Sequence, residues 1–139
     1  YGIPDFKMPK DIIDRRLAQM VAEGTVFKTG ANIGREDVAA LRADFDAVVL
    51  AVGALAPREL STPGHELGGV HQAMTYLPQG NRLFAGDIDR PAIDAAGKHV
   101  IIIGGGDTAA DCLGTANRQG AISVTVLDHN PARSRAPGW

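Results

Sequence analysis

The strongest constraint on the fold is a run of three glycines that separates an apolar segment from a helix-compatible one. Residues 98–103 (KHVIII) are almost continuously apolar, which predicts a strand covered on both faces of a parallel sheet. The glycines at 104–106 follow at once, then a helix over residues 107–119 that Gly120 ends. Residues 123–127 (SVTVL) predict a second strand. Together these elements form one βαβ unit, whose crossover we expect to be right-handed.

The glycine turn fits the dinucleotide-binding pattern G-x-G-x-x-G/A in the structural context that this pattern requires. Gly104 permits a tight turn after the strand, Gly106 lets a pyrophosphate approach the backbone, and Ala109 allows close packing of the helix. The amide groups and the dipole of the helix start then face the phosphates. We therefore prefer nucleotide binding to a purely structural turn. The predicted site comprises Gly104, Gly105, Gly106, Asp107, Thr108 and Ala109.

The choice of coenzyme is left open by the residues after the second strand. Asp128 ends this strand about 20 residues after the glycine turn, where an acid hydrogen-bonds the ribose 2′-hydroxyl and favours NAD. His129, Arg133 and Arg135 follow in the next loop and could bind a 2′-phosphate, which favours NADP. The arginines could equally be solvated loop charges.

Other polar residues near the turn have simpler interpretations. We expect Asp107 to cap the helix and Asp111 to interact favourably with the helix dipole, neither being catalytic. Cys112 is predicted to be a packed small hydrophobe and not a redox thiol. No metal site is predicted, because no metal-ligand spacing relates the four histidines, which are His65, His71, His99 and His129.

Composition excludes several classes of function. The apolar fraction of 45%, the charged fraction of 22% and the net charge of −2 suit a globular domain without a basic field for nucleic acid or anionic lipid. No apolar run has the length of a membrane span, and we expect a cytoplasmic protein. A single cysteine excludes an internal disulfide and a four-cysteine iron–sulfur site ligated by this chain alone.

The first half of the chain predicts a second α/β region. Residues 46–54 (DAVVLAVGA) resemble a further strand buried on both faces and ending near Gly53. The other expectations are an amphipathic helix over residues 9–23, a short strand at 25–29, helices around 35–43 and 69–77, and an irregular linker over 78–96.

With these motifs placed, the whole chain resembles a known family. The opening YGIPDFKMPK (residues 1–10) is similar to the segment after the FAD fingerprint in the small (β) subunit of bacterial glutamate synthase. The likeness continues through residues 47–54, through IGGGDTAADC (residues 103–112) and into the tail at 124–139. On this basis we identify an internal fragment of a glutamate synthase small subunit, within the flavoproteins that resemble pyridine nucleotide-disulfide oxidoreductases.

This resemblance implies an α/β flavoprotein with Rossmann-like parallel sheets and two dinucleotide sites. Electrons would pass from NADPH to FAD, then through [4Fe-4S] clusters that this chain does not ligate, to a large (α) subunit that makes glutamate from glutamine and 2-oxoglutarate. Residues 1–77 would belong to the FAD domain and residues 97–139 to the first part of the NAD(P)H domain. Asp128 and Arg133 would complete the NADPH site. Residues expected near FAD are Gly2, Ile3, Pro4 and Gly53.

The sequence also departs from the family pattern. Val52 stands where the family usually has threonine, and neither an FAD fingerprint nor cluster cysteines are present, so we expect an interior piece that is inactive alone. NADPH–ferredoxin oxidoreductases and the flavoprotein part of dihydropyrimidine dehydrogenase share the same segments and are alternatives. An alternative of another class is a non-catalytic nucleotide-binding fragment.

Overall fold

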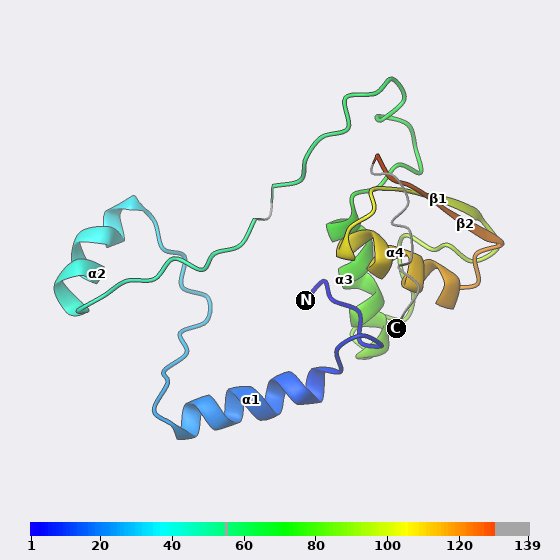
Figure 1. The fold of residues 1–139 in the computed structure, drawn as a ribbon. Helices are drawn as coiled ribbons and strands as arrows, with labels where there is room; N and C mark the ends of the chain where they lie inside the picture. The colour runs from blue at the N-terminus through cyan, green and yellow to red at the C-terminus, as the bar shows by residue number, and fades with distance from the viewer. Residues whose placement is uncertain (55, 130–139) are drawn as a thin grey trace, which may run out of the picture. The chain divides into compact units, whose positions relative to one another are not determined.

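The structure is a computed structural model that describes residues 1–54 and 56–129 (Figure 1). The described chain divides into two compact units, one made of Tyr1–Pro9 with residues 57–129 and the other of Lys10–Ala56. In chain order the elements are α1 (Lys10–Ala22), the 3₁₀ helix η1 (Arg35–Asp37), α2 (Val38–Asp44), α3 (Ala73–Phe84), β1 (His99–Ile103), α4 (Asp107–Arg118) and β2 (Ser123–Leu127).

The first unit contains the expected βαβ motif, and the predicted α/β class is confirmed. Strands β1 and β2 pair in parallel, from His99 opposite Ser123 to Ile103 opposite Leu127. Helix α4 connects them and packs on both strands, as Figure 1 shows. The element bounds agree with the sequence prediction to within one residue at each end, because the motif depends on contacts between segments close in sequence.

Helix α4 lies between the two-stranded sheet and α3, since it contacts both and forms the centre of the unit. Its inner face is made of small residues, and Ala116 at its middle has 0% of its surface exposed. Small side chains let helices approach closely. The buried apolar residues are Leu77, Ala95, Ala109, Cys112 and Ala116.

The outer face of β1 differs from the expectation of a strand covered on both sides. Val100 and Ile102 are partly buried on one face, whereas Ile101 keeps 66% of its surface exposed on the other. Within the first unit, helix α4 covers one face, and no second layer made of this unit's described residues lies on the other. The strand itself was thus predicted correctly, but the described residues of its own unit cover one of its two faces and not both.

Helix α3 corrects the expected position of the linker. Pro78, expected at the start of an irregular segment, lies inside α3, which begins at Ala73 and continues to Phe84. A proline there removes one helical hydrogen bond, and burial of Leu77 and Asn81 on either side of it offsets the loss. The expected domain boundary at residue 77 therefore falls within a helix, while the assignment of each part to a cofactor stays a prediction.

The loop after α3 is held by glutamine side chains. The Oε1 atom of Gln79 accepts hydrogen bonds from the N–H groups of Ala92 and Ile93, at 2.7 and 3.0 Å. Gln119, the C-cap residue of α4, accepts hydrogen bonds at Oε1 from the Ala95 N–H at 3.1 Å and from the Tyr76 hydroxyl at 2.6 Å. Part of the segment expected to be an irregular linker is thus hydrogen-bonded to glutamine side chains, which hydrophobic periodicity cannot reveal.

The second unit contains the expected helices but not the expected strands. Helix α1 and the η1–α2 pair match the predicted positions. Residues 46–54 form no strand, and Val49 has 87% of its surface exposed. A parallel strand needs a neighbour for its backbone groups, and the two strands of the described chain pair with each other. The strand predicted at 25–29 is absent from the described chain for the same reason. No helix among the described residues is long and apolar enough to cross a membrane.

Candidate dinucleotide site

The glycine turn leaves the sheet at the carboxyl end of β1. Gly104 has φ of +124°, a conformation that L side chains rarely adopt, and its N–H donates to the Leu127 carbonyl at 2.8 Å. This bond extends the pairing of β1 and β2 by one residue. The turn and the residue that follows β2 are therefore brought to the same edge of the sheet, where open α/β sheets bind their ligands.

Helix α4 begins directly after the turn, with Gly106 as its N-cap residue in an extended conformation. The expectation that Asp107 caps the helix is wrong, because Asp107 lies in the first helical turn. A glycine cap supplies no side-chain oxygen of its own to the first-turn amide groups, which are the donors that bind anions at helix N-termini. A Cβ added to Gly106 would meet no atom of residues 1–54 and 56–129 within 4 Å, so these residues leave the space beside its backbone open.

Gly105 has a different environment from Gly106. A Cβ added to Gly105 would overlap the Asp128 carboxylate, so this side chain fills the space above the turn. Asp128 also forms an ion pair with His129 when that histidine is protonated, with 3.4 Å between Oδ1 and Nδ1. The structure thus brings Asp128 to the glycine turn, as predicted from its position after β2. Arg133 and Arg135 lie outside the described residues.

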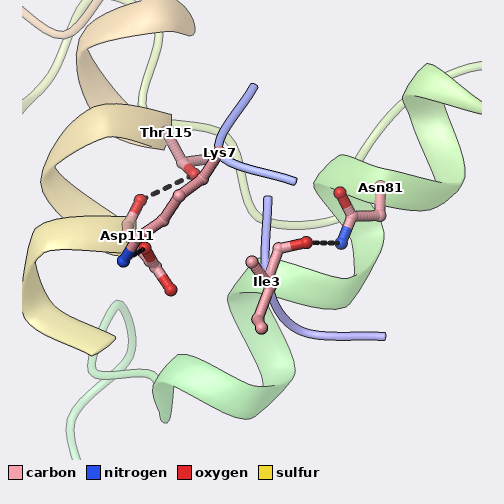
Figure 2. A network of polar contacts seen from close by, with 5 residues as sticks. All are labelled: Ile3, Lys7, Asn81, Asp111 and Thr115. Carbon is pink, nitrogen blue, oxygen red and sulfur yellow. Dashed lines mark hydrogen bonds and ion pairs between the residues drawn. The ribbon is translucent and has the colours of Figure 1, made fainter. Parts of the chain in front are cut away.

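The buried side of α4, which includes Asp111 and Thr115, takes part in a network of polar contacts (Figure 2). Lys7 Nζ forms an ion pair with Asp111 Oδ1 at 2.8 Å, and only 10% of the Asp111 side chain is exposed. The hydrogen bond to Asp111 raises the pKa of Lys7, and the charges of Asp111 and Asp107 add to this effect. Asp111 therefore has a specific cationic partner, beyond the helix-dipole interaction predicted for it. Thr115 Oγ1 donates to the Asp111 backbone carbonyl at 2.8 Å.

Cys112 is buried on the same face of α4, which confirms its interpretation as a packing residue. Burial, followed by the nearby Asp111 charge, raises the pKa of the thiol to about 11. A thiol that stays protonated at neutral pH is a poor nucleophile. Among the described residues, no group of three or more His, Cys, Asp or Glu side chains could hold a metal ion.

The four residues predicted to lie near FAD belong to different units. Gly2, Ile3 and Pro4 lie in the first unit with α3 and α4, whereas Gly53 lies in the second. Gly2 has a packing role, since a Cβ there would approach the Met74 Cε atom to 3.0 Å. Their contact with FAD stays a prediction.

Asn81 is the residue that the sequence analysis missed. It is 3% exposed and hydrogen-bonds the backbone of the first residues of the chain. An asparagine in a weakly periodic segment carries no signal of such distant partners, so only the tertiary structure reveals this contact.

Comparison with known proteins decides the family. The model of the pyridine nucleotide-disulphide oxidoreductase family matches residues 10–136. The chain belongs to this family. This match confirms the resemblance to pyridine nucleotide-disulphide oxidoreductases that was identified in the sequence. The glycine turn at the carboxyl edge of the parallel sheet agrees with this membership.

The relatives of this oxidoreductase chain carry consistent names. The glutamate synthase [NADPH] small chain of Mycobacterium tuberculosis is 57% identical over 100% of this chain and 30% of its own length. A putative glutamate synthase [NADPH] small chain of Cereibacter sphaeroides is 46% identical over 99% of this chain and 34% of its own. The glutamate synthase [NADH] of Schizosaccharomyces pombe is 42% identical over 97% of this chain and 7% of its own. The chain thus spans about a third of the length of the small-chain relatives it matches.

Proposed function

We propose that this chain is part of the electron-input subunit of a glutamate synthase. In this proposal the subunit passes a hydride from NADPH to FAD, and a large (α) partner subunit forms glutamate from glutamine and 2-oxoglutarate. Membership of the oxidoreductase family supports the redox role, and the names of the relatives support the glutamate synthase assignment. The observation that carries the proposal is the open backbone at Gly106, at the start of α4 and at the carboxyl edge of the sheet.

The residues of the turn fit the pyrophosphate of a dinucleotide. Gly104 makes the turn, Gly106 leaves space beside its backbone, and the first-turn amides of α4 offer donors to phosphate oxygens. Ala109 is buried on the inner side of the helix and keeps it close to the strands. When bound, NADPH supplies a hydride and FAD accepts it. The chain's own contribution at this site is to bind and orient the nucleotide.

Asp128 bears on the choice between NADPH and NADH. Its carboxylate lies against Gly105, and we propose that it binds the ribose 2′-hydroxyl, as an acid at about this spacing from the glycine turn does in dinucleotide-binding folds. The relatives include proteins named for NADPH and proteins named for NADH, which supports use of either coenzyme within the family. We propose a mild preference for NADPH, with Arg133 meeting the 2′-phosphate.

The remaining parts of the proposal concern the flavin side and the larger assembly. Gly2, Ile3, Pro4 and Gly53 are proposed to lie near FAD, with residues 1–77 in the FAD domain and 97–139 in the nicotinamide domain. The [4Fe-4S] clusters would be ligated by other parts of the subunit, since this chain has one cysteine. We place the assembly in the cytoplasm.

The deciding experiment uses the full-length subunit together with its large partner subunit. We expect oxidation of NADPH that requires both glutamine and 2-oxoglutarate. Oxidation that ignores both compounds while reducing a ferredoxin or a pyrimidine would overturn the glutamate synthase assignment and favour one of the related flavoproteins. A subunit that purifies without a flavin absorption band and does not bind NADPH would overturn the oxidoreductase proposal as a whole.

A further inference from the structure

The first nine residues, which we call the N-terminal segment (Tyr1–Pro9), are anchored on α3 through one buried side chain. Asn81 Nδ2 donates to the carbonyl oxygens of Tyr1 and Ile3, at 2.6 and 2.8 Å, and Asn81 Oδ1 accepts from the Asp5 N–H at 3.0 Å. Figure 2 shows the Asn81 amide beside the Ile3 backbone. The amide orientation is defined by its partners, because two are acceptors and one is a donor. No other residue type of this size offers both groups in this way.

The same segment is anchored on α4 at two further points. Lys7 forms its ion pair with Asp111, and the Arg118 guanidinium lies over the Phe6 ring at 3.6 Å from the ring centre. Phe6 and Lys7 lie within a tight turn, in which the Pro4 carbonyl accepts from the N–H groups of Lys7 and Met8, both at 3.0 Å. The first residues of the segment are therefore held by α3 and its turn by α4.

These contacts connect the segment to the glycine turn through a single helix. Asp111 is one helical turn after Asp107, which is about 6 Å along the axis of α4. A nucleotide at the start of α4 and the segment at its inner face would thus share one rigid element. Rigid secondary elements that contact two sites are able to fix the geometry between them.

We propose that Asn81 is a positioning residue that sets the N-terminal segment, and with it Gly2, Ile3 and Pro4, relative to the nicotinamide site. This inference rests on the proposed function, in which those three residues lie near FAD and the glycine turn holds NADPH. Hydride transfer depends steeply on the separation and alignment of donor and acceptor. Loss of the Asn81 hydrogen bonds would therefore slow hydride transfer more than it weakens nucleotide binding.

The test compares the full-length wild-type subunit with Asn81→Ala and with Asn81→Asp, which keeps the shape but removes the two N–H donors. Asn117→Ala is the matched control, since Asn117 is an exposed asparagine on α4. If either Asn81 variant fails to fold, Lys7→Met with Asp111→Asn is a second variant that releases the same segment from α4 without leaving an unpaired charge at Asp111; it should likewise speed exchange at Asp5 and slow flavin reduction, and no change in either would overturn the positioning role. Two quantities are measured: hydrogen exchange at the Asp5 amide, and anaerobic flavin reduction over a range of NADPH concentrations.

We expect exchange at Asp5 to become about tenfold faster in both Asn81 variants and unchanged in Asn117→Ala. The limiting rate of flavin reduction should fall about tenfold, while the NADPH concentration at half the limiting rate changes less than about twofold. Unchanged exchange at Asp5 would overturn the anchoring role, whatever the activity. Faster exchange with an unchanged limiting rate would overturn the positioning role alone. Failure of the wild-type flavin to be reduced by NADPH would instead overturn the proposed function.

Discussion

Replacing Gly106 by alanine separates nucleotide binding from folding. Gly106 has φ of −84° and ψ of −171°, which alanine adopts freely, and the alanine Cβ would contact no atom of the described residues within 4 Å. The N-cap position favours glycine over alanine, so the expected loss of stability is below about 1 kcal/mol. The added methyl would keep the pyrophosphate from the backbone and weaken one charge-assisted hydrogen bond, which is worth about 1.5–3 kcal/mol. The dissociation constant should rise about 10- to 100-fold.

The measurement is a calorimetric titration of the full-length subunit with NADP⁺, because the oxidised coenzyme does not reduce the flavin. Thermal unfolding in the absence of coenzyme is recorded in parallel. Gly105→Ala is an informative comparison, since its methyl would displace Asp128 and leave Gly106 open. An NADP⁺ affinity within about twofold of wild type for Gly106→Ala would remove the glycine turn from the nucleotide site.

Three further predictions concern the packing of the first unit. Alanine in place of glycine within a helix usually raises the free energy of unfolding by about 1 kcal/mol, but Gly114→Ala should not, because its Cβ would approach Phe6 Cζ to 2.7 Å. The increase should reappear in the Phe6→Ala background, and urea unfolding of the four variants measures both effects. Leu77→Ala should destabilise by about 2–4 kcal/mol in the same assay, whereas Leu83→Ala, on the more exposed side of α3, should cost less than about 1 kcal/mol. The raised pKa of Cys112 means that the folded chain keeps its thiol proton longer than the unfolded chain, so this stabilisation is complete below pH 9 and is lost toward pH 11. Stability measured at pH 8 and pH 10 should therefore fall less in Cys112→Ala than in wild type, and equal falls would contradict the assigned burial.

The sequence was most informative where the structure depends on neighbouring residues. The βαβ motif and the position of Asp128 at the glycine turn follow from strand pattern, turn glycines and spacing, all within one supersecondary unit. The apolar run at 46–54 has the composition of a strand, but composition cannot supply the neighbouring strands that would pair with it. Pro78 suggested an irregular segment because its local penalty is visible in the sequence, whereas the burial of Leu77 and Asn81 that offsets it is not.

The polar network around Asp111 and Asn81 likewise depends on contacts between residues far apart in the sequence. Lys7 and Asp111 are 104 residues apart in the chain, and Asn81 is 80 residues from Tyr1. Nothing in the local pattern of either helix distinguishes an aspartate that binds a lysine from one that is solvated. The position of Asp128 beside the glycine turn was thus predictable from the motif, whereas the residues that anchor the N-terminal segment on α3 and α4 were not.

The division of the first unit into two separated pieces of chain has a consequence for biosynthesis. Residues 1–9 must remain undocked until α3 and α4 have been made, because their hydrogen-bonding and ionic partners come 76 to 104 residues later. At translation rates of about 5–20 residues per second, the segment waits for roughly 5–20 s before Asp111 is synthesised. Closing so long a loop is entropically costly and slow, and docking of the segment should be a late step of folding.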